Sequence, residues 1–203
     1  MNGSDLLRYA RVHRAGAIVV GLSVVAVLSA FFGGTRISLP SIGSASLSSG
    51  VPYRQELPLL SAVFLTAALG GSMTAHEASG AFVSHRLHRA YFVALTLVAC
   101  AISFGTESLA VGAEQGVVFV RSILIWLGLA LLSVRLFGEQ LGWVIPMASA
   151  FLLIWYPLNW WDWTANPASD PFSWCAAAVS LALGAVATAA TPWRRRAFLR
   201  KRG

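Results

Sequence analysis

Long apolar segments alternate with short polar segments along the whole chain. About 20 consecutive apolar residues are what an α-helix needs to cross the hydrocarbon layer of a bilayer. The pattern predicts six spans, at residues 15–34, 57–75, 90–105, 117–137, 141–158 and 173–191. We therefore expect an all-α integral membrane protein, a single domain of residues 1–203 with six transmembrane helices.

The polar segments between the expected spans differ in composition. Residues 35–56 are rich in Ser, Gly and Pro, and we expect them to form an outer loop. Residues 106–116 carry Glu107 and Glu114 and are expected to form a second outer loop, whereas residues 138–140 should make a tight inner turn. Within the fifth span, Pro146 is expected to introduce a kink, which neighbouring helices can accommodate in lipid.

The segment before the first span has an amphipathic pattern. Ser4 and Asp5 are suited to cap a short helix over residues 4–13, with apolar and basic residues on different faces. This pattern is typical of a helix that lies at the membrane interface. A plain basic segment flanking the first span is the alternative.

Composition excludes a soluble domain. The 203 residues are 57% hydrophobic and only 11% charged, whereas soluble domains carry about 25% charged residues. The two cysteines, Cys100 and Cys175, lie in or beside apolar spans and are interpreted as small buried hydrophobic residues rather than a disulfide.

The distribution of basic residues predicts the topology. The formal charge is +7, from 15 basic and 8 acidic residues. Twelve of the 15 basic residues fall in segments on one side of the six expected spans; the exceptions are Arg36, Arg54 and Arg121. Basic residues in short loops stay in the cytoplasm, so both termini are expected inside. The basic tail is interpreted as topology and contact with anionic lipids, and no nucleic-acid partner is expected.

The expected spans contain few ionisable residues. No Asp, Glu, His or Lys lies near the middle of an expected span, which argues against an intramembrane enzyme or a proton relay, because such functions need ionisable groups at depth. The deepest charge is Arg121, expected to extend its guanidinium toward the outer water; a substrate contact is the alternative. His85 and His88 share a helix face, but solvated side chains are favoured over a metal site.

Two further patterns suggest contacts. Three tryptophans and one aspartate lie together in the outer segment 159–172: Trp160, Trp161, Asp162 and Trp163. Clustered tryptophans are typical of the membrane–water interface, and an outer gate or re-entrant hairpin is the alternative. In the sixth span, small residues recur every four positions, which favours close helix packing, within the chain or with a second copy. They are Ala176, Ser180, Gly184 and Thr188.

The polar segment 76–89 lies between the second and third spans and contains three of the four histidines. Its order, Glu77-Ala78-Ser79-Gly80-Ala81-Phe82-Val83 followed by Arg86 and Arg89, resembles the cytoplasmic segment of permease subunits of ABC-2 type exporters. In that family, acidic residues, a glycine, apolar residues and a basic end occur in this order. The interfacial helix, the six spans and the segment 159–172, in the place of the outer re-entrant helices, extend the resemblance in layout over nearly the whole chain.

The resemblance implies a division of labour. A separate cytosolic ABC ATPase dimer would bind ATP and Mg²⁺, and this chain would hold no cofactor and catalyse nothing. Two permease copies, identical or paralogous, would move an apolar or amphipathic cargo such as a peptide, an antibiotic or a lipid-like molecule. The expected ATPase contacts are Glu77, Gly80, Phe82, Val83, Arg86, Leu87 and Arg89. The chain has no phosphate-binding loop, and Lys201 is its one lysine.

Two other function classes remain open from the sequence. The chain is alternatively a structural or assembly subunit of another membrane complex, or a membrane redox protein or enzyme. An ordinary cytoplasmic loop is the alternative interpretation of residues 76–89.

Overall fold

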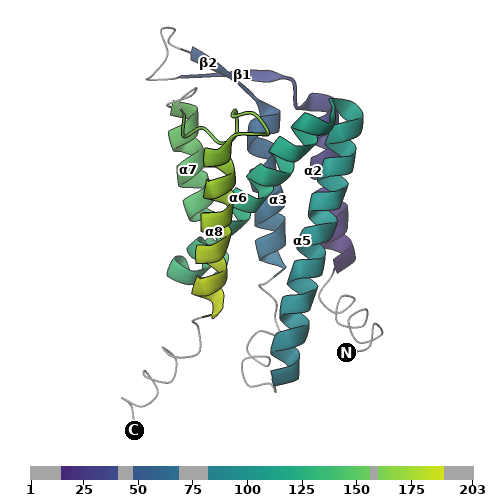
Figure 1. The fold of residues 1–203 in the computed structure, drawn as a ribbon, viewed down its shortest axis with the longest axis vertical. Helices are drawn as coiled ribbons and strands as arrows, with labels where there is room; N and C mark the ends of the chain where they lie inside the picture. Colours follow the sequence, from purple (N-terminus) through teal and green to yellow (C-terminus); the bar gives the residue numbers. More distant parts are fainter. Residues whose placement is uncertain (1–14, 41–47, 69–81, 156–159, 190–203) are drawn as a thin grey trace.

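The computed structural model of the chain describes residues 15–40, 48–68, 82–155 and 160–189 (Figure 1). The regular secondary structure of these residues is helical apart from one two-stranded hairpin. In chain order the elements are α2 (Ala15–Phe32), β1 (Arg36–Pro40), β2 (Ser48–Pro52), α3 (Tyr53–Ala67), α5 (Phe82–Ala110), α6 (Ala113–Phe137), the 3-10 turn η1 (Glu139–Leu141), α7 (Val144–Trp155) and α8 (Pro171–Ala189). The interfacial helix expected at residues 4–13 lies outside the described residues.

Four of the described helices are long and apolar enough to cross a membrane: α2, α5, α6 and α8. Their apolar windows have mean hydropathies between 1.5 and 2.4, so the expectation of a helical membrane protein is supported at this level. The helices at the second and fifth expected spans are shorter, with 15 residues in α3 and 12 in α7. Among the described residues, the structure thus gives four helices of spanning length, whereas the hydropathy pattern predicts six spans for the whole chain.

Helix α6 is the centre of the fold. It packs against α3, α5, α7 and α8 and runs obliquely between them (Figure 1). Within its apolar window 61% of the residues are buried, compared with 22% in α2, α5 and α8. Large buried side chains of α6, such as Phe119, Ile123 and Trp126, form the core together with Leu22 and Leu65 from α2 and α3. The outer faces of the peripheral helices are left apolar and exposed.

The contact between α6 and α8 is made by small residues. A Cβ atom on Gly128 would lie 2.3 Å from the backbone carbon of Ser180, and one on Gly184 would lie 2.9 Å from the Gly128 carbonyl oxygen. These distances leave no room for a side chain, because real Cβ contacts do not come this close. Absence of a side chain at Gly128 and Gly184 therefore allows the two backbones to touch.

The expected outer loop at residues 106–116 is wrong. Helix α5 continues to Ala110 and α6 begins at Ala113, so the connection is a short turn in which Gly112 has a φ of +118°. The loop was expected because Glu107 and Glu114 are charged. In the structure Glu107 is a fully buried helical residue with a cationic partner, which is why the helix does not end before it.

Residues 35–56 contain regular structure that their Ser-, Gly- and Pro-rich composition did not predict. Strands β1 and β2 pair antiparallel, with Arg36 opposite Pro52 and Pro40 opposite Ser48. Two further hydrogen bonds extend the base of the hairpin, from Tyr53 N to Thr35 O at 3.1 Å and from Arg54 N to Gly33 O at 3.1 Å. The hairpin thereby holds the start of α3 against the end of α2.

The kink expected at Pro146 has no cause in the structure. Pro146 is the third residue of α7, within the first helical turn. Backbone N–H groups of the first turn have no partner inside their own helix, so the missing N–H of proline removes no helical hydrogen bond there. The preceding turn is formed by η1, close to the tight turn expected at residues 138–140.

Candidate functional site

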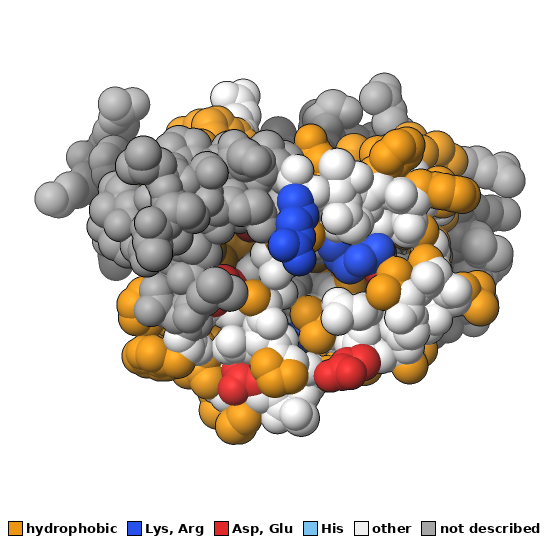
Figure 2. Space-filling view, turned by 90° about the horizontal axis from the view of Figure 1, so that it is seen from above, with side chains coloured by type: hydrophobic (Ala, Val, Ile, Leu, Met, Phe, Trp, Pro, Cys, Tyr) orange, Lys and Arg blue, Asp and Glu red, His pale blue; other side chains and the backbone are white. Residues whose placement is uncertain are grey.

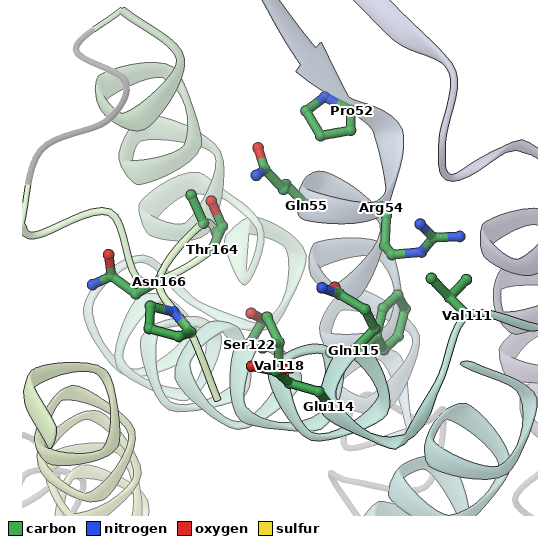
Figure 3. A pocket seen from close by; sticks show the side chains of 13 residues that line it. Pro52, Arg54, Gln55, Val111, Glu114, Gln115, Val118, Ser122, Thr164 and Asn166 are labelled. Carbon is green, nitrogen blue, oxygen red and sulfur yellow. The ribbon is translucent and has the colours of Figure 1, made fainter. Parts of the chain in front are cut away.

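Polar residues gather at the end of the bundle that carries the hairpin, which we call the outer end. They surround a cavity of about 260 Å³ between the start of α3, the start of α6 and the loop 160–170 (Figure 3). Figure 2 looks onto this end and shows a hollow with arginine side chains on one side and acidic side chains on the other. The lining residues are Pro52, Arg54, Gln55, Val111, Glu114, Gln115, Val118, Phe119, Ser122, Thr164, Ala165, Asn166 and Pro167.

An ion pair joins three helices beside this cavity. Arg54 Nε donates to Glu107 Oε2 at 2.8 Å, and Arg54 Nη2 donates to the Ser29 carbonyl oxygen at 3.3 Å. The Glu107 side chain is fully buried and that of Arg54 is 18% exposed. A buried charge without a partner is costly, so this contact fixes α2, α3 and α5 relative to one another.

Arg121 holds the outer loop 160–170 in place. Its guanidinium donates to three backbone carbonyl oxygens, those of Pro167 at 2.6 Å, Asn166 at 2.7 Å and Trp163 at 2.9 Å. The residue is completely buried, so the expectation that it extends into the outer water is wrong. The guanidinium finds acceptors within the protein because the loop turns its carbonyl groups toward α6.

Side-chain hydrogen bonds give the outer loop a defined shape. Asp162 Oδ1 accepts from the hydroxyl of Thr164 at 2.6 Å and from its backbone N–H at 3.2 Å. Asp170 caps α8, since its Oδ2 accepts from the N–H of Ser173 at 2.9 Å, and Pro171 takes the first helical position, where proline is favoured. The hydroxyl and then the N–H of Ser173 lower the pKa of the Asp170 carboxyl.

Glu56 adds a titratable group beneath the outer loop. It lies in the first turn of α3, before the apolar residues of the expected second span at 57–75. Burial, and then the negative charge of Asp162, raise the pKa of Glu56 to about 7. Among the described residues none donates a hydrogen bond to its Oε2 atom, which is buried, so the carboxyl gains little by ionising.

A second hollow, lined by apolar residues, lies on the side of the bundle. It has a volume of about 310 Å³ and lies between α5, α6 and the first turn of α8. Its lining residues are Cys100, Ala101, Phe104, Val117, Val120 and Trp174. It offers no polar side chain to fix a ligand, apart from the indole N–H of Trp174, which already donates to the Ala168 carbonyl oxygen at 2.8 Å.

The expected ATPase contacts that the structure describes lie at the start of α5, at the end of the bundle opposite the outer cavity. Glu77 and Gly80 lie outside the described residues. The structure places Phe82, Val83, Arg86 and Leu87 in the first turns of α5, and describes only the backbone of these four residues. Arg89, two residues after Leu87, is exposed. The backbone thus brings the second half of the segment 76–89 onto one continuous helix.

The four residues of the outer segment divide between the surface and the interior. Trp160 and Trp161 are 68% and 38% exposed. Asp162 is buried, and the ring of Trp163 packs edge-on against Trp126 of the core, with 5.5 Å between the ring centroids. The loop therefore presents two tryptophans outward while its other half anchors it to α6.

Only some of the four small residues of the sixth expected span lie in a helix contact of α8. Ser180 and Gly184 lie against Gly128 of α6, whereas Ala176 is half-buried and Thr188 is exposed. The buried positions of α8 include Ser173 and Ala177, because a helix repeats every 3.6 residues and not every four. The contact that the structure describes is within the chain.

The residues that sequence reasoning missed are Arg54, Glu56 and Glu107. One feature of the sequence could have indicated them. These charges flank apolar segments on the side of the expected spans that has few basic residues, and the topology does not require charges at those positions. Within the described ranges, no three His, Cys, Asp or Glu residues gather as metal ligands would. The chain matches no protein-family model, no curated protein and no solved structure.

Proposed function

We propose that this chain is the permease subunit of an ABC-2 type exporter in the cell membrane. In this proposal it has six spans, with α3 and α7 as the second and fifth, and both termini in the cytoplasm. A separate ABC ATPase dimer hydrolyses ATP, and two permease copies move an apolar or amphipathic cargo. The chain itself catalyses no reaction.

The observation that carries the proposal is the length of α5. The helix has 29 residues, but its apolar window covers only Arg89–Ala110. The seven residues from Phe82 to His88 extend the helix by about 10 Å at the end where α2 begins and α8 ends (Figure 1). A rigid helical extension of a membrane span is suited to transmit a push from a soluble partner into the bundle.

The distribution of charge at the two ends of the bundle supports the orientation. Arg86, Arg89 and Arg135 lie at the end with the helical extension, and Arg135 is in the last turn of α6. The acids Glu56, Glu107 and Glu114 all lie at the outer end, two of them buried or half-buried. Twelve of the 15 basic residues of the chain fall in segments expected on the side of the extension, and because basic residues in short loops stay in the cytoplasm, this count favours the extension as the cytoplasmic end.

The surface of the bundle is compatible with a lipid bilayer and a second permease copy. Large apolar side chains are exposed on the peripheral helices, including Val20 at 63%, Leu97 at 65% and Val186 at 65%. Exposed apolar area of this kind needs lipid or another protein to cover it.

The proposal is tested by co-purification with an ABC ATPase from the same cell. Phe82→Asp and Glu77→Arg are expected to reduce the amount of ATPase recovered by about fivefold or more, because each places the wrong charge or polarity in the proposed contact. The matched control is Leu109→Asp, on a residue that is 92% exposed at the outer end of the same helix. Normal ATPase recovery with both variants would refute the coupling role. Stable co-purification with other membrane proteins and no ATPase would favour a structural subunit.

A further inference from the structure

The outer cavity offers hydrogen-bonding groups that the protein itself does not use. Within the described part of the chain, no group donates to or accepts from the carboxamides of Gln55 and Gln115 or the hydroxyl of Ser122. In Figure 3 the two carboxamides extend into the space between α3, α6 and the loop residue Thr164. Each carboxamide presents one carbonyl acceptor and one NH₂ donor group, so the cavity can pair with a ligand that also carries both.

The charge available to a ligand in this cavity is negative. Arg54 and Glu114 are the charged residues that line it. The guanidinium of Arg54 is already bound to Glu107 and to the Ser29 carbonyl oxygen. Glu114 is exposed in the first turn of α6, and no described residue forms an ion pair with it. A ligand with a cationic end would therefore complement the cavity better than an anionic one.

The walls of the cavity are held in place without a ligand. Pro167 and Asn166 line the cavity, and their carbonyl groups are fixed by Arg121. Thr164, on the same wall, is fixed by its two hydrogen bonds to Asp162. Preformed walls reduce the ordering that binding would otherwise require, so weak polar contacts suffice for measurable affinity.

We propose that the outer cavity binds the amino-terminal end of a short peptide. The ammonium group lies beside Glu114, and the first peptide groups pair with Gln55, Gln115 and Ser122. A peptide group carries one donor and one acceptor, as a carboxamide does, whereas a sugar would leave the charge of Glu114 uncompensated. The volume of about 260 Å³ lies at the small end of the range for ligand pockets and has room for a few small residues.

The inference deepens the proposed function, since it selects a peptide from the possible cargoes and relies on that function for the side of the membrane. Binding itself is a property of this chain alone. It is measured on the purified chain in lipid nanodiscs, with no ATPase present, by calorimetric titration. Failure to bind peptide leaves the ATPase co-purification result unchanged, and failure of co-purification leaves the titration unchanged, so the two outcomes are distinguishable.

Four probes separate the features of the ligand: Gly-Gly-Gly-amide, its N-acetylated form, ethylamine and glucose. We expect the free-amine tripeptide amide to bind tightest. Acetylation should weaken binding about twofold to fivefold, which is the effect of an exposed ion pair. Ethylamine and glucose should bind at least about tenfold more weakly, because each lacks the peptide groups or the charge. No binding of the tripeptide amide at about 10 mM, or equal binding of acetylated peptide or glucose, would overturn the proposal.

Variants of exposed lining residues locate the site. Glu114→Gln should abolish the preference for the free amine, and Gln115→Leu should weaken both tripeptides about threefold to tenfold, because one or two hydrogen bonds are lost. Both residues are exposed, so the thermal unfolding temperature should stay unchanged. Glu139→Gln, on an exposed acid in η1 at the other end of α6, is the control and should bind as the wild type does. Wild-type binding by both Glu114→Gln and Gln115→Leu would refute the site.

Discussion

Helix α6 meets its neighbours in two different ways along its length. Its outer half uses charge and hydrogen bonds, with Arg121 bound to three carbonyl groups of the loop 160–170. Its inner half uses close backbone contact, with Gly128 against Ser180 and Gly184 of α8. Polar contacts depend on the partner's identity and charge, whereas the close contact depends on the absence of a side chain. The two halves should therefore respond to different substitutions.

The ion pair beside the outer cavity should give the largest effect. Glu107→Leu leaves the Arg54 guanidinium without its carboxylate in a largely buried position, and we expect a loss of about 3–5 kcal/mol in the free energy of unfolding. The double variant Arg54→Met/Glu107→Leu should recover most of this loss, since both charges are removed. Unfolding by SDS, followed by circular dichroism, measures each variant. Equal instability of the single and double variants would mean that the pair does not carry this energy.

Arg121 should come second. Arg121→Met removes all three donors to the loop carbonyl groups, and a loss of about 2–3 kcal/mol is expected from buried acceptors left without partners. Amide hydrogen exchange over residues 160–170 should become faster, while exchange in α8 stays slow. Arg135→Met, in the last turn of α6, is the control. Unchanged exchange in the loop would show that Arg121 does not hold it.

The helix–helix contact should respond to a single methyl group. Gly128→Ala places a Cβ atom against the Ser180 backbone, which cannot move aside as a side chain would, and we expect a loss of about 1–3 kcal/mol. Gly105→Ala in α5 is the matched control, because no atom lies within 4 Å of the position, and it should be neutral or stabilising by up to about 1 kcal/mol. Similar unfolding free energies for the two variants would disprove the close contact.

The smallest effect should be a pH dependence at the outer end. The pKa of Glu56 is raised to about 7, above its value in the unfolded chain, so its contribution to stability is fully present below about pH 4.5 and is lost as the pH rises through 7. With allowance for partial exposure, wild type should lose about 1–2 kcal/mol between pH 5 and pH 8, whereas Glu56→Gln should not. The same loss in both proteins would assign the dependence to another group.

The long apolar helices could be predicted from the sequence to within a few residues. The expected spans 15–34, 117–137 and 173–191 correspond to α2, α6 and α8, because a run of 18 or more apolar residues has few alternatives to a helix in lipid. Boundaries were wrong where a charged residue continued a helix, as Glu107 does in α5. A hydropathy average scores each charged residue separately and takes no account of an ion-pair partner.

The candidate site was less predictable than the helices. Sequence order separates Arg54 from Glu107 by 53 residues and Arg121 from Pro167 by 46, so nothing local indicates that these groups meet. The tryptophan segment at 159–172 was interpreted as lying at the membrane–water interface and the small residues of α8 as a helix contact, but their partners on α6 were not predicted. Contacts between residues so far apart in the sequence depend on how the helices cross. A short stretch of sequence carries no information about that crossing.

The amino-acid sequence by itself determined the long apolar helices, which are long and apolar enough to cross a membrane, because such runs have few alternatives to a helix in lipid. It also placed the polar segment 76–89 between the second and third expected spans. Only the tertiary structure decided that Arg54, Glu107 and Arg121 are buried or nearly buried beside the outer cavity, where they hold α2, α3, α5, α6 and the outer loop together. Burial of a charge is stable only with a partner, and the partners come from distant parts of the chain.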